Sequence, residues 1–531
     1  MSLPLPQPAD LALTRLARNF IGLDRVDPVL GGGGMRRRVY LDTTATALIP
    51  RAVHDGLGAY YQAASANSHT RAHRAGHATT EAIEATRDRV GRFVGYDPAE
   101  DVVLLPGNGA TGAINFLARA LFAPELRLVL KRFRDERAAD VLRELLREAV
   151  PEVAEGLDEL LRRPIVVTTR MEHHSNILPW VEAVGRHNLR VIGVTADGRL
   201  DLDELARVLE AEGSRVRLLA VTGASNVTGV LNPVHELARM AHAVGARILV
   251  DAAQLAPHRP LDLHPHGMPA DARLDFVALS GHKLYAPGSR GVLAGSFAPF
   301  ERRACIGDVG GGMVEYVSTE DFQVKDEITA REEAGTPNIP GTLSLGMVAC
   351  LLEQVGMDAV AAAEEALTAY AMDRLRSVPG LHLYGPEDPA ARVGVFSFAL
   401  AGVPYGLVAA YLDDYHNIAV RDGCFCAHPY VKELLKVGPG EERDYLTSLA
   451  AGDRRTVPGM VRASLGLYST RDDMDALTAA LSELARDRDR IIKRYRQAVD
   501  GSFTHEAAAG ARHGAAAEAL FSLDVACACL K

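Results

Sequence analysis

The sequence predicts an α/β fold with a mostly parallel sheet, followed by a second, smaller α/β region. Short apolar runs alternate with helical patterns along the first part of the chain, which is typical of βαβ units. A length of 531 residues exceeds one ordinary hydrophobic core and indicates two domains. Several of the apolar runs also end in small and polar residues, where open parallel sheets bind their ligands.

Composition and pattern divide the chain into five segments. Residues 1–38 form an N-terminal arm, and residues 39–345 form the large domain, with a charged, helical insertion at about 126–163. Residues 346–500 form the small domain. Residues 501–531 form a tail rich in alanine and glycine, which we expect to be partly mobile.

The apolar runs also place the expected strands. In the large domain they are residues 102–105, 165–168, 190–194, 217–222, 247–250 and 276–279, and in the small domain 393–400, 418–420 and 460–464. The four glycines at 31–34 resemble a phosphate loop only in composition. Because no strand precedes them and no helix obviously follows, we interpret them as a flexible linker.

Composition restricts the class of protein. Hydrophobic and charged residues make up 48% and 24% of the chain, as in ordinary globular proteins. The net charge of −10 argues against a nucleic-acid binder and favours small-molecule or protein partners. No apolar run reaches the roughly 20 residues of a membrane helix, and the first residues show no signal-peptide pattern. With only six cysteines, the chain is not a disulfide scaffold, and we expect a cytoplasmic protein.

Lys283 is the most informative residue. It follows the strand expected at 276–279, and Ser280 and His282 lie just before it. An amine at the end of such a strand can form a Schiff base with an aldehyde cofactor, provided that its pKa falls below the usual value of about 10.4. The alternative is a solvated surface lysine, which is the commoner fate of this residue type.

A glycine-rich turn at 107–112 follows the first expected strand and opens a helical pattern. Such a turn offers free backbone N–H groups and the positive end of a helix dipole to an anion, and Thr111 adds a hydroxyl. The glycines are equally compatible with a turn chosen for geometry alone.

Polar residues follow two further strands. Asp251 ends the strand at 247–250 and can keep a pyridinium nitrogen protonated, while Gln254 can reach a ring oxygen. His173 and His174 follow the strand at 165–168 and can stack on a flat ring or transfer protons. Alternatively, the aspartate caps a helix and the histidines are exposed or hydrogen-bonded for structural reasons.

Seven segments occur together in one order. They are residues 40–46 (YLDTTAT), 172–180 (EHHSNILPW), 225–229 (SNVTG), 251–254 (DAAQ), 280–283 (SGHK), 333–338 (EAGTPN) and 461–464 (VRAS). With these segments the chain resembles the class V, fold-type I pyridoxal 5′-phosphate enzymes, and among them the Suf-type (group II) cysteine desulfurases and selenocysteine lyases. The resemblance spans residues 39–490 and implies a large, mostly parallel seven-stranded sheet domain with a smaller C-terminal α/β domain.

The resemblance implies a role for each matching residue around the cofactor ring. Lys283 forms the covalent link and moves protons at the α-carbon of the substrate. Asp251 pairs with the pyridinium nitrogen, Gln254 contacts the ring hydroxyl, and His173 stacks over the ring.

The phosphate and the subunit arrangement are also implied by the resemblance. Thr111, Ser280 and His282 hold the phosphate together with the backbone of Ala110. Thr336 reaches the phosphate of the neighbouring subunit's cofactor, which implies a homodimer with shared sites.

The substrate side of the site is implied to contain two arginines and a cysteine. Arg462 binds the substrate carboxylate, because a planar guanidinium donates two parallel hydrogen bonds. Asn226 assists near this carboxylate and the cofactor ring, and Arg421 is a further substrate-binding residue. Counted from Arg421, Cys426 falls on the desulfurase cysteine that takes sulfur from L-cysteine and becomes a persulfide. Arg421 is the expected source of positive charge for its thiolate. A sulfur-acceptor protein is then an expected partner.

Three departures from the family pattern concern sulfur transfer more than the cofactor. Cys424 and Phe425 stand where the family usually has a histidine or another residue, and the run Cys-Phe-Cys is similar to the desulfurase domain of molybdenum-cofactor sulfurases. Thr43 and Thr44 replace the usual Asn-Ala. A rebuilt segment at about 430–457 separates the cysteine from Arg462.

The remaining cysteines have simpler interpretations. Cys305 and Cys350 lie in apolar surroundings and are interpreted as packing residues. Cys424 and Cys426 could form a redox pair. They could also form a metal site with His428 and the cysteines of the tail, Cys527 and Cys529. Because one Cys-x-Cys spacing is a poor zinc signature, no metal is assigned. The two tail thiols could instead receive the persulfide.

Three functions remain open at this level. The first is a cysteine desulfurase. The second keeps the cofactor but acts as a C–S lyase on a cysteine conjugate or sulfoxide, or as an epimerase or aminotransferase, none of which needs the loop cysteine. The third is a catalytically silent sulfur-relay protein, which the joint presence of Lys283, Asp251, Gln254 and Arg462 disfavours.

Overall fold

The computed structural model describes residues 8–32, 34–122, 164–301 and 306–508. Its centre is a seven-stranded sheet in which five strands run parallel in the order β9, β8, β7, β5, β6, and β10 separates β4 from β9 by antiparallel pairing. The strands are β4 (Asp101–Leu104), β5 (Ile165–Thr169), β6 (Leu189–Ile192), β7 (Val216–Thr222), β8 (Arg247–Asp251), β9 (Phe276–Ser280) and β10 (Gly291–Ser296). The predicted fold class, α/β with a mostly parallel sheet, is confirmed.

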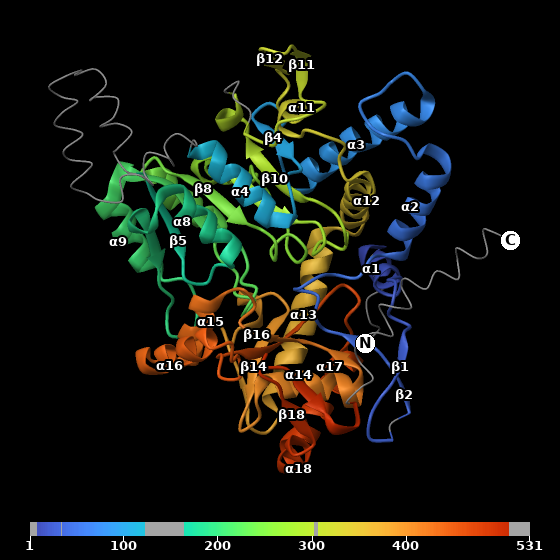
Figure 1. The fold of residues 1–531 in the computed structure, drawn as a ribbon, viewed down its shortest axis with the longest axis vertical. Helices are drawn as coiled ribbons and strands as arrows, with labels where there is room; N and C mark the ends of the chain where they lie inside the picture. The colour runs from blue at the N-terminus through green and yellow to red at the C-terminus, as the bar shows by residue number, and fades with distance from the viewer. Residues whose placement is uncertain (1–7, 33, 123–163, 302–305, 509–531) are drawn as a thin grey trace, which may run out of the picture.

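Helices cover both faces of this sheet (Figure 1). Alternate residues of each strand point to opposite faces, so Val166 and Leu218 pack on one side, and Val167 and Leu219 on the other. The first side is covered by α4 (Gly109–Leu121) and α8 (Leu178–Val184). The second side is covered by α3 (Arg74–Phe93), α9 (Leu202–Glu212), α10 (Val234–Ala243) and α12 (Ile339–Val355).

The six strands predicted for the large domain are all present, with ends shifted by one or two residues. The strand that sequence reasoning missed is β10. It begins and ends with the small residues Gly291 and Ser296, and no crossover helix joins it to β9, because the two strands pair antiparallel. Its pattern therefore lacks the alternation with helices that reveals its neighbours.

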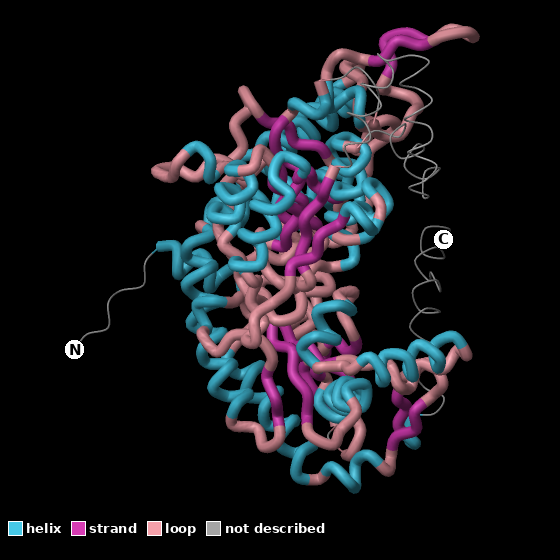
Figure 2. Tube along the Cα trace, turned by 90° about the vertical axis from the view of Figure 1, so that its left-hand side faces the viewer, coloured by secondary structure: helices cyan, strands magenta, loops and turns pink. Residues whose placement is uncertain are grey.

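The C-terminal part has its own sheet and core. Four antiparallel strands in the order β13, β14, β17, β16 pack against helices α13, α14 and α17. Their bounds are β13 (Leu381–Leu383), β14 (Val395–Leu400), β16 (Arg421–Gly423), β17 (Met460–Ser464), α13 (Met357–Arg376), α14 (Tyr405–His416) and α17 (Arg471–Arg486). The strand expected at 418–420 is β15 (Ile418–Ala419), which pairs outside this sheet with β3 (Val39–Tyr40). Figures 1 and 2 show this part below the large sheet.

The N-terminal arm departs from expectation. After α1 (Pro8–Ala17), the strands β1 (Val26–Pro28) and β2 (Met35–Arg37) pair antiparallel, so the described glycines at 31, 32 and 34 belong to the turn of a hairpin rather than to a flexible linker. All three have positive φ, which glycine adopts without strain. A strand, β1, does precede the glycines, and this short, largely exposed strand left no pattern in the sequence.

Two expected boundaries also need correction. A boundary after residue 345 would cut α12, whose residues as far as Leu352 pack into the core of the large domain. The end of the small domain lies beyond residue 500, because β19 (Phe503–His505) pairs with β18 (Tyr495–Gln497) and the side chain of His505 is buried. The remainder of the expected tail, 509–531, and the whole of the expected insertion at about 126–163 lie outside the described residues.

The remaining elements lie on the periphery of these two cores or connect them. The rebuilt segment after the cysteine contains two helices, α15 (His428–Leu435) and α16 (Pro439–Ala450). The others are α2 (Arg51–Ala64), β11 (Val314–Val317), β12 (Phe322–Val324), α11 (Ile328–Glu332) and α18 (Arg488–Ile492).

Within the described ranges, no single helix has the length and apolar character to cross a membrane. Only α12 and α13 taken together have them, and these two helices bend by 78° at their junction.

Candidate active site

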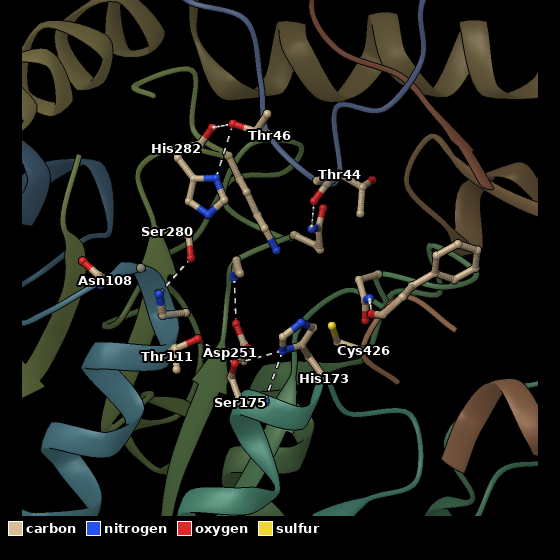
Figure 3. Close-up of a pocket in the computed structure, with 18 of the residues that line it drawn as sticks. Thr44, Thr46, Asn108, Thr111, His173, Ser175, Asp251, Ser280, His282 and Cys426 are labelled. Atoms are coloured by element: carbon tan, nitrogen blue, oxygen red, sulfur yellow. Dashed lines mark hydrogen bonds between the residues drawn. The ribbon is translucent and has the colours of Figure 1, made fainter. Parts of the chain in front are cut away.

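A cavity of about 610 Å³ lies where the carboxyl ends of the parallel strands face the small domain. β7 ends at Thr222, β8 at Asp251 and β9 at Ser280, so parallel pairing brings three sequence-distant polar residues to one edge. The small domain contributes Phe425 and Cys426 together with two arginines, Arg421 and Arg462. Figure 3 shows this cavity and the side chains around it.

One end of the cavity is a cradle for an anion. Gly107 and Gly109 have positive φ, and a Cβ on Gly109 would lie 2.8 Å from the hydroxyl of Ser280, so the turn requires glycine. The N–H of Ala110 at the start of α4 donates to Ser280 Oγ over 2.8 Å, and Thr111 Oγ1 lies 2.6 Å from Ser175 Oγ. Hydroxyls and backbone N–H groups at the first turn of a 13-residue helix suit a phosphate dianion.

His282 closes the same end. Its Nδ1 lies 3.4 Å from Thr46 Oγ1, and its carbonyl accepts from the N–H of Ala47. Burial, followed by the charge of Lys283, lowers the pKa of His282 to about 4. The ring is therefore neutral at physiological pH, so it can donate a hydrogen bond to the phosphate without adding charge.

Lys283 and Asp251 form the chemical centre. Removal from water lowers the pKa of Lys283 to about 8, against the opposing effect of the Asp251 carboxylate. Burial raises the pKa of Asp251, while the N–H of Ala253, 3.0 Å from Oδ1, and Lys283 act in the other direction. A lysine whose amine is substantially unprotonated near neutral pH is suited to covalent catalysis on a carbonyl group.

The side chain of Gln254 is buried in the same wall. Its amide donates to the carbonyl of Thr44 over 3.0 Å, which fixes its direction. The hydroxyl of Thr44 is buried, and among the described residues it has no hydrogen-bond partner; the same is true of the hydroxyl of Ser289, which also lines the cavity. Unpaired hydroxyls in a cavity wall are suited to a polar ligand.

His173 stands over the opposite wall of the cavity. Its Nδ1 lies 3.0 Å from Ser175 Oγ and accepts from the N–H of Ser175 over 3.1 Å, so the ring cannot rotate freely. Burial, followed by Lys283, lowers the pKa of His173 to about 4. A neutral, fixed imidazole is suited to stacking on a flat ring and to accepting a proton at Nε2.

A buried glutamate lies behind this wall and escaped sequence reasoning. Glu172 accepts from Thr169 Oγ1 at 2.5 Å, from Asn176 Nδ2 at 2.7 Å and from the N–H of Thr222 at 3.0 Å. Burial raises its pKa to about 8. The glutamate ties the end of β5 to the end of β7 and thereby fixes the backbone on which His173 stands. The sequence signal that could have revealed this glutamate is its position directly before His173 and His174 in the Glu-His-His run.

Three contacts join Arg462 to the cysteine loop. The guanidinium donates from Nη1 to the carbonyl of Asn226 over 3.0 Å, Asn226 Nδ2 donates to the carbonyl of Phe425 over 2.8 Å, and the ring of Phe425 lies 4.7 Å from Arg462 Cζ. The fourth neighbour is Asp42, whose Oδ1 is 3.4 Å from Nη2. Arg462 is buried, and within the described chain its Nε–H has no partner, so the fork retains capacity for a carboxylate.

Arg421 lies at the rim of the cavity that Cys426 also lines. Its side chain is 57% exposed, and its guanidinium lies 3.9 Å from the carboxylate of Asp42. A negative charge on Cys426 raises the pKa of both Lys283 and Arg462, although it is the smallest of the effects on each. Arg421 borders the cavity but is better placed to neutralise Asp42 than to bind substrate.

Cys426 is exposed, and Figure 3 shows its sulfur directed toward the interior of the site. Phe425 and Cys426 have φ of +53° and +55°, two consecutive left-handed residues that cost about 1–2 kcal/mol each. Cys424 points elsewhere: its thiol donates to the carbonyl of Pro458 over 2.8 Å, and burial raises its pKa to about 11. Cys424 is thus a packing residue, and Cys426 is the thiol available for chemistry.

Three further expectations concern residues outside this cavity. Thr336 does not line it; its exposed hydroxyl accepts from Asn67 Nδ2 over 3.2 Å. No group of three or more metal-ligating side chains occurs in the part of the chain that the structure covers, which leaves the suggested Cys424–Cys426–His428 metal site without support there. Cys350 is partly buried, and Cys305, Cys527 and Cys529 lie outside the described residues.

Comparison with known proteins gives a consistent result. The family model described as aminotransferase class-V matches residues 39–132 and 148–477. A probable cysteine desulfurase of Halalkalibacterium halodurans is 33% identical over 448 residues, and a cysteine desulfurase of Dickeya dadantii is 34% identical over 460 residues. Each alignment covers 84% of this chain and 92% of the relative.

Solved structures agree. The cysteine desulfurase CsdA from Escherichia coli superposes with a TM-score of 0.66 at 26% identity, over 91% of this chain and 98% of that one. The apo cysteine desulfurase from Thermococcus onnurineus NA1 superposes with a TM-score of 0.68 at 26% identity, over 91% and 100%. Proteins of this family depend on pyridoxal 5′-phosphate, and the anion cradle, the lysine and the buried aspartate of the cavity fit that cofactor. The chain belongs to the class-V aminotransferase family and, within it, to the cysteine desulfurase family.

Proposed function

We propose that the protein is a pyridoxal-phosphate-dependent cysteine desulfurase that removes sulfur from L-cysteine and receives it on Cys426. The observation that carries the proposal is the position of this thiol. It borders the same cavity as Lys283 and Arg462. A C–S lyase, epimerase or aminotransferase of this fold would need no nucleophile in that place.

Each side of the cavity performs a different part of the reaction. The cradle around Ala110, Ser280 and His282 would hold the phosphate of the cofactor, and Asp251 would hold its pyridinium nitrogen. Bound pyridoxal phosphate supplies an electron sink that weakens the bonds around the α-carbon of the amino acid. Lys283 would carry the covalent attachment and move the α-proton, since its amine is unprotonated more often than that of a free lysine.

Substrate recognition falls to Arg462. The substrate carboxylate would occupy the guanidinium fork on the side of the free Nε–H and displace the long contact with Asp42. The side chain of the bound cysteine is then directed toward the wall that holds Cys426 and His173. Asn226 fixes both the arginine and the loop, so binding and sulfur transfer share one support.

The sulfur transfer balances without an external oxidant. The Cys426 thiolate forms an S–S bond with the substrate sulfur as the substrate C–S bond breaks, and the electron pair of that bond returns to the carbon. Protonation of this carbon completes L-alanine, and Cys426 is left as a persulfide. A thiol reductant or an acceptor protein then takes the terminal sulfur and restores the thiol.

The decisive comparison is between the wild type and Cys426→Ser, with Cys424→Ser as the matched control. We measure sulfide and L-alanine released from L-cysteine in the presence of a thiol reductant. The wild type and Cys424→Ser should each release sulfide and L-alanine in equal amounts. In Cys426→Ser the rate of release should fall at least about 10³-fold, as expected for removal of a nucleophile. Undiminished activity of Cys426→Ser would place the chain among the lyases.

The pKa of Lys283 gives a second prediction, on cofactor uptake. The folded-state pKa is lowered to about 8, so the unprotonated fraction rises about tenfold per pH unit up to pH 8 and then levels off. Covalent incorporation of pyridoxal phosphate into the apoenzyme, measured by borohydride trapping, should follow this curve. The same reaction with a free lysine derivative should keep rising to about pH 10.4. If incorporation into the apoenzyme kept rising to about pH 10.4, as with the free lysine derivative, the cavity would not depress this pKa.

Assembly, subgroup and location are part of the proposal. We place the chain in the Suf-type subgroup and propose a homodimer in which Thr336 reaches the cofactor phosphate of the partner, because this exposed residue lies outside the cavity of its own chain. A mass of one chain by light scattering would contradict the dimer. The cytoplasm suits the free thiols of Cys350, Cys424 and Cys426, and cell fractionation tests that location.

A further inference from the structure

Two histidines join the cysteine loop to the large domain at the rim of the cavity. The ring of His174, which follows β5, lies nearly parallel to the ring of His428, the first residue of α15, with centroids 4.8 Å apart at 10°. Their closest nitrogens, His174 Nε2 and His428 Nδ1, are 3.0 Å apart. His428 lies two residues after Cys426, so this contact lies at the exit of the cysteine loop.

The hydrogen bonds determine which nitrogen carries the proton. The backbone N–H of His428 lies 3.2 Å from His174 Nε2, and a backbone N–H can only donate. His174 Nε2 is therefore an acceptor and carries no proton, and the Nδ1–H tautomer of His428 shares the single lone pair of this nitrogen as a second donor. In the other direction, the N–H of His174 donates to the carbonyl of Cys426 over 2.8 Å.

The loop needs such support. Phe425 and Cys426 both adopt left-handed backbone conformations that non-glycine residues avoid. The near side of the loop is held by Asn226, which donates to the carbonyl of Phe425 over 2.8 Å. His174 holds the far side through its contacts with the carbonyl of Cys426 and with His428. The side chain of Cys426 therefore stands on a backbone that is held on both sides.

We propose that His174 and His428 are positioning residues, a clasp that holds Cys426 in the wall of the active site, and that the clasp exists only while His174 Nε2 is unprotonated. The role in sulfur transfer rests on the proposed desulfurase function. The clasp itself rests only on the geometry of these two histidines and the strained loop.

The surroundings favour the unprotonated state at physiological pH. Burial, followed by the charge of His428, lowers the pKa of His174 below its usual value, and burial with Lys432 does the same for His428. The same two segments also carry His173, whose ring centroid is 6.2 Å from that of His174, and the ion pair between Arg170 and Glu433, whose nitrogen and oxygen are 2.7 Å apart. Because this pKa is lowered, His174 becomes protonated only at a pH below the usual value for histidine, and protonation would replace an acceptor by a donor facing two donors.

Hydrogen exchange of the holoenzyme tests the clasp independently of catalysis. Protection factors are measured for peptides that cover residues 424–431 in the wild type and three variants. His428→Ala removes the ring donor, His174→Gln replaces Nε2 by an amide oxygen that accepts but does not titrate, and His266→Ala alters an exposed histidine elsewhere in the large domain.

The expected pattern distinguishes a clasp from general destabilisation. Loss of one hydrogen bond should lower protection about fivefold in His428→Ala, and His266→Ala should match the wild type. Wild-type protection should fall as the pH is lowered from 7.5 to 5, whereas His174→Gln should keep its protection over the same range. Unchanged protection in His428→Ala, or the same pH response in His174→Gln as in the wild type, would overturn the clasp.

Sulfide release measured on the same samples tests the positioning role. His428→Ala should lower kcat about fivefold and leave KM for L-cysteine within about twofold, because Arg462 is not touched. Lowered protection with full kcat would show that the clasp does not position Cys426. A wild type that releases no sulfide would instead refute the desulfurase proposal, while the exchange data would still decide on the clasp.

Discussion

Replacement of Lys283 by alanine is expected to reduce L-cysteine turnover by at least about 10³-fold, the largest effect of any single substitution outside the cysteine loop. Two functions are lost together, the covalent attachment of the cofactor and the transfer of the α-proton, and general acid–base catalysis alone contributes about 10²–10⁴-fold. The visible or near-ultraviolet absorbance band of the attached cofactor should disappear in the same variant. Initial rates and absorbance spectra of one preparation measure both.

A matched lysine substitution excludes an effect of charge alone. Lys493 is exposed at the end of α18, far along the chain from the site, and Lys493→Ala should retain both the band and wild-type turnover. Turnover of Lys283→Ala above about one tenth of the wild type would mean that another amine, or no amine, carries the chemistry. The anion cradle remains intact in the variant, so free pyridoxal phosphate should still bind without a covalent bond.

Replacement of Arg462 by lysine is expected to lower kcat/KM for L-cysteine about 100-fold, mainly through KM. The guanidinium is buried and donates in a fixed plane to Asn226, and a lysine cannot present two parallel donors to a carboxylate. Loss of one charge-assisted hydrogen bond of up to about 3 kcal/mol corresponds to a factor of about 100. Steady-state kinetics with L-cysteine give the value.

The second arginine is the control for this prediction. Arg421 is more than half exposed and faces Asp42, so Arg421→Lys should change kcat/KM no more than about threefold. A larger effect of Arg421→Lys than of Arg462→Lys would exchange the roles of the two residues. It would move the carboxylate site to the rim of the cavity, contrary to the role that the resemblance implies for Arg462.

The chemistry of the site was more predictable than its connections. Asp251 and Lys283 each stand at the end of an apolar run, and parallel strands bring such ends together whatever lies between them in the sequence. Glu172 was missed because a glutamate in a polar motif resembles a surface residue. Its burial results from Thr222 and Asn176, which no local pattern relates to it.

Segments with short or exposed strands were the least predictable. The tetraglycine was interpreted as a linker because its flanking strands are only three residues long and largely exposed, so they lack an alternating pattern. The contact between His174 and His428 joins residues 254 positions apart on two domains, and no sequence pattern relates one to the other. Position relative to Arg421 assigned the desulfurase cysteine to Cys426 but left the role of Cys424 open, and only the burial of Cys424 identifies it as a packing residue.

The most direct test of the account is the mass of the Cys426 peptide after a single turnover. The holoenzyme is mixed with one equivalent of L-cysteine without reductant, alkylated, digested and analysed by mass spectrometry. The account predicts one additional sulfur atom on Cys426, none on Cys424, and L-alanine in equal amount. Alanine or another product without sulfur on Cys426 would contradict the central claim that this residue is the sulfur acceptor.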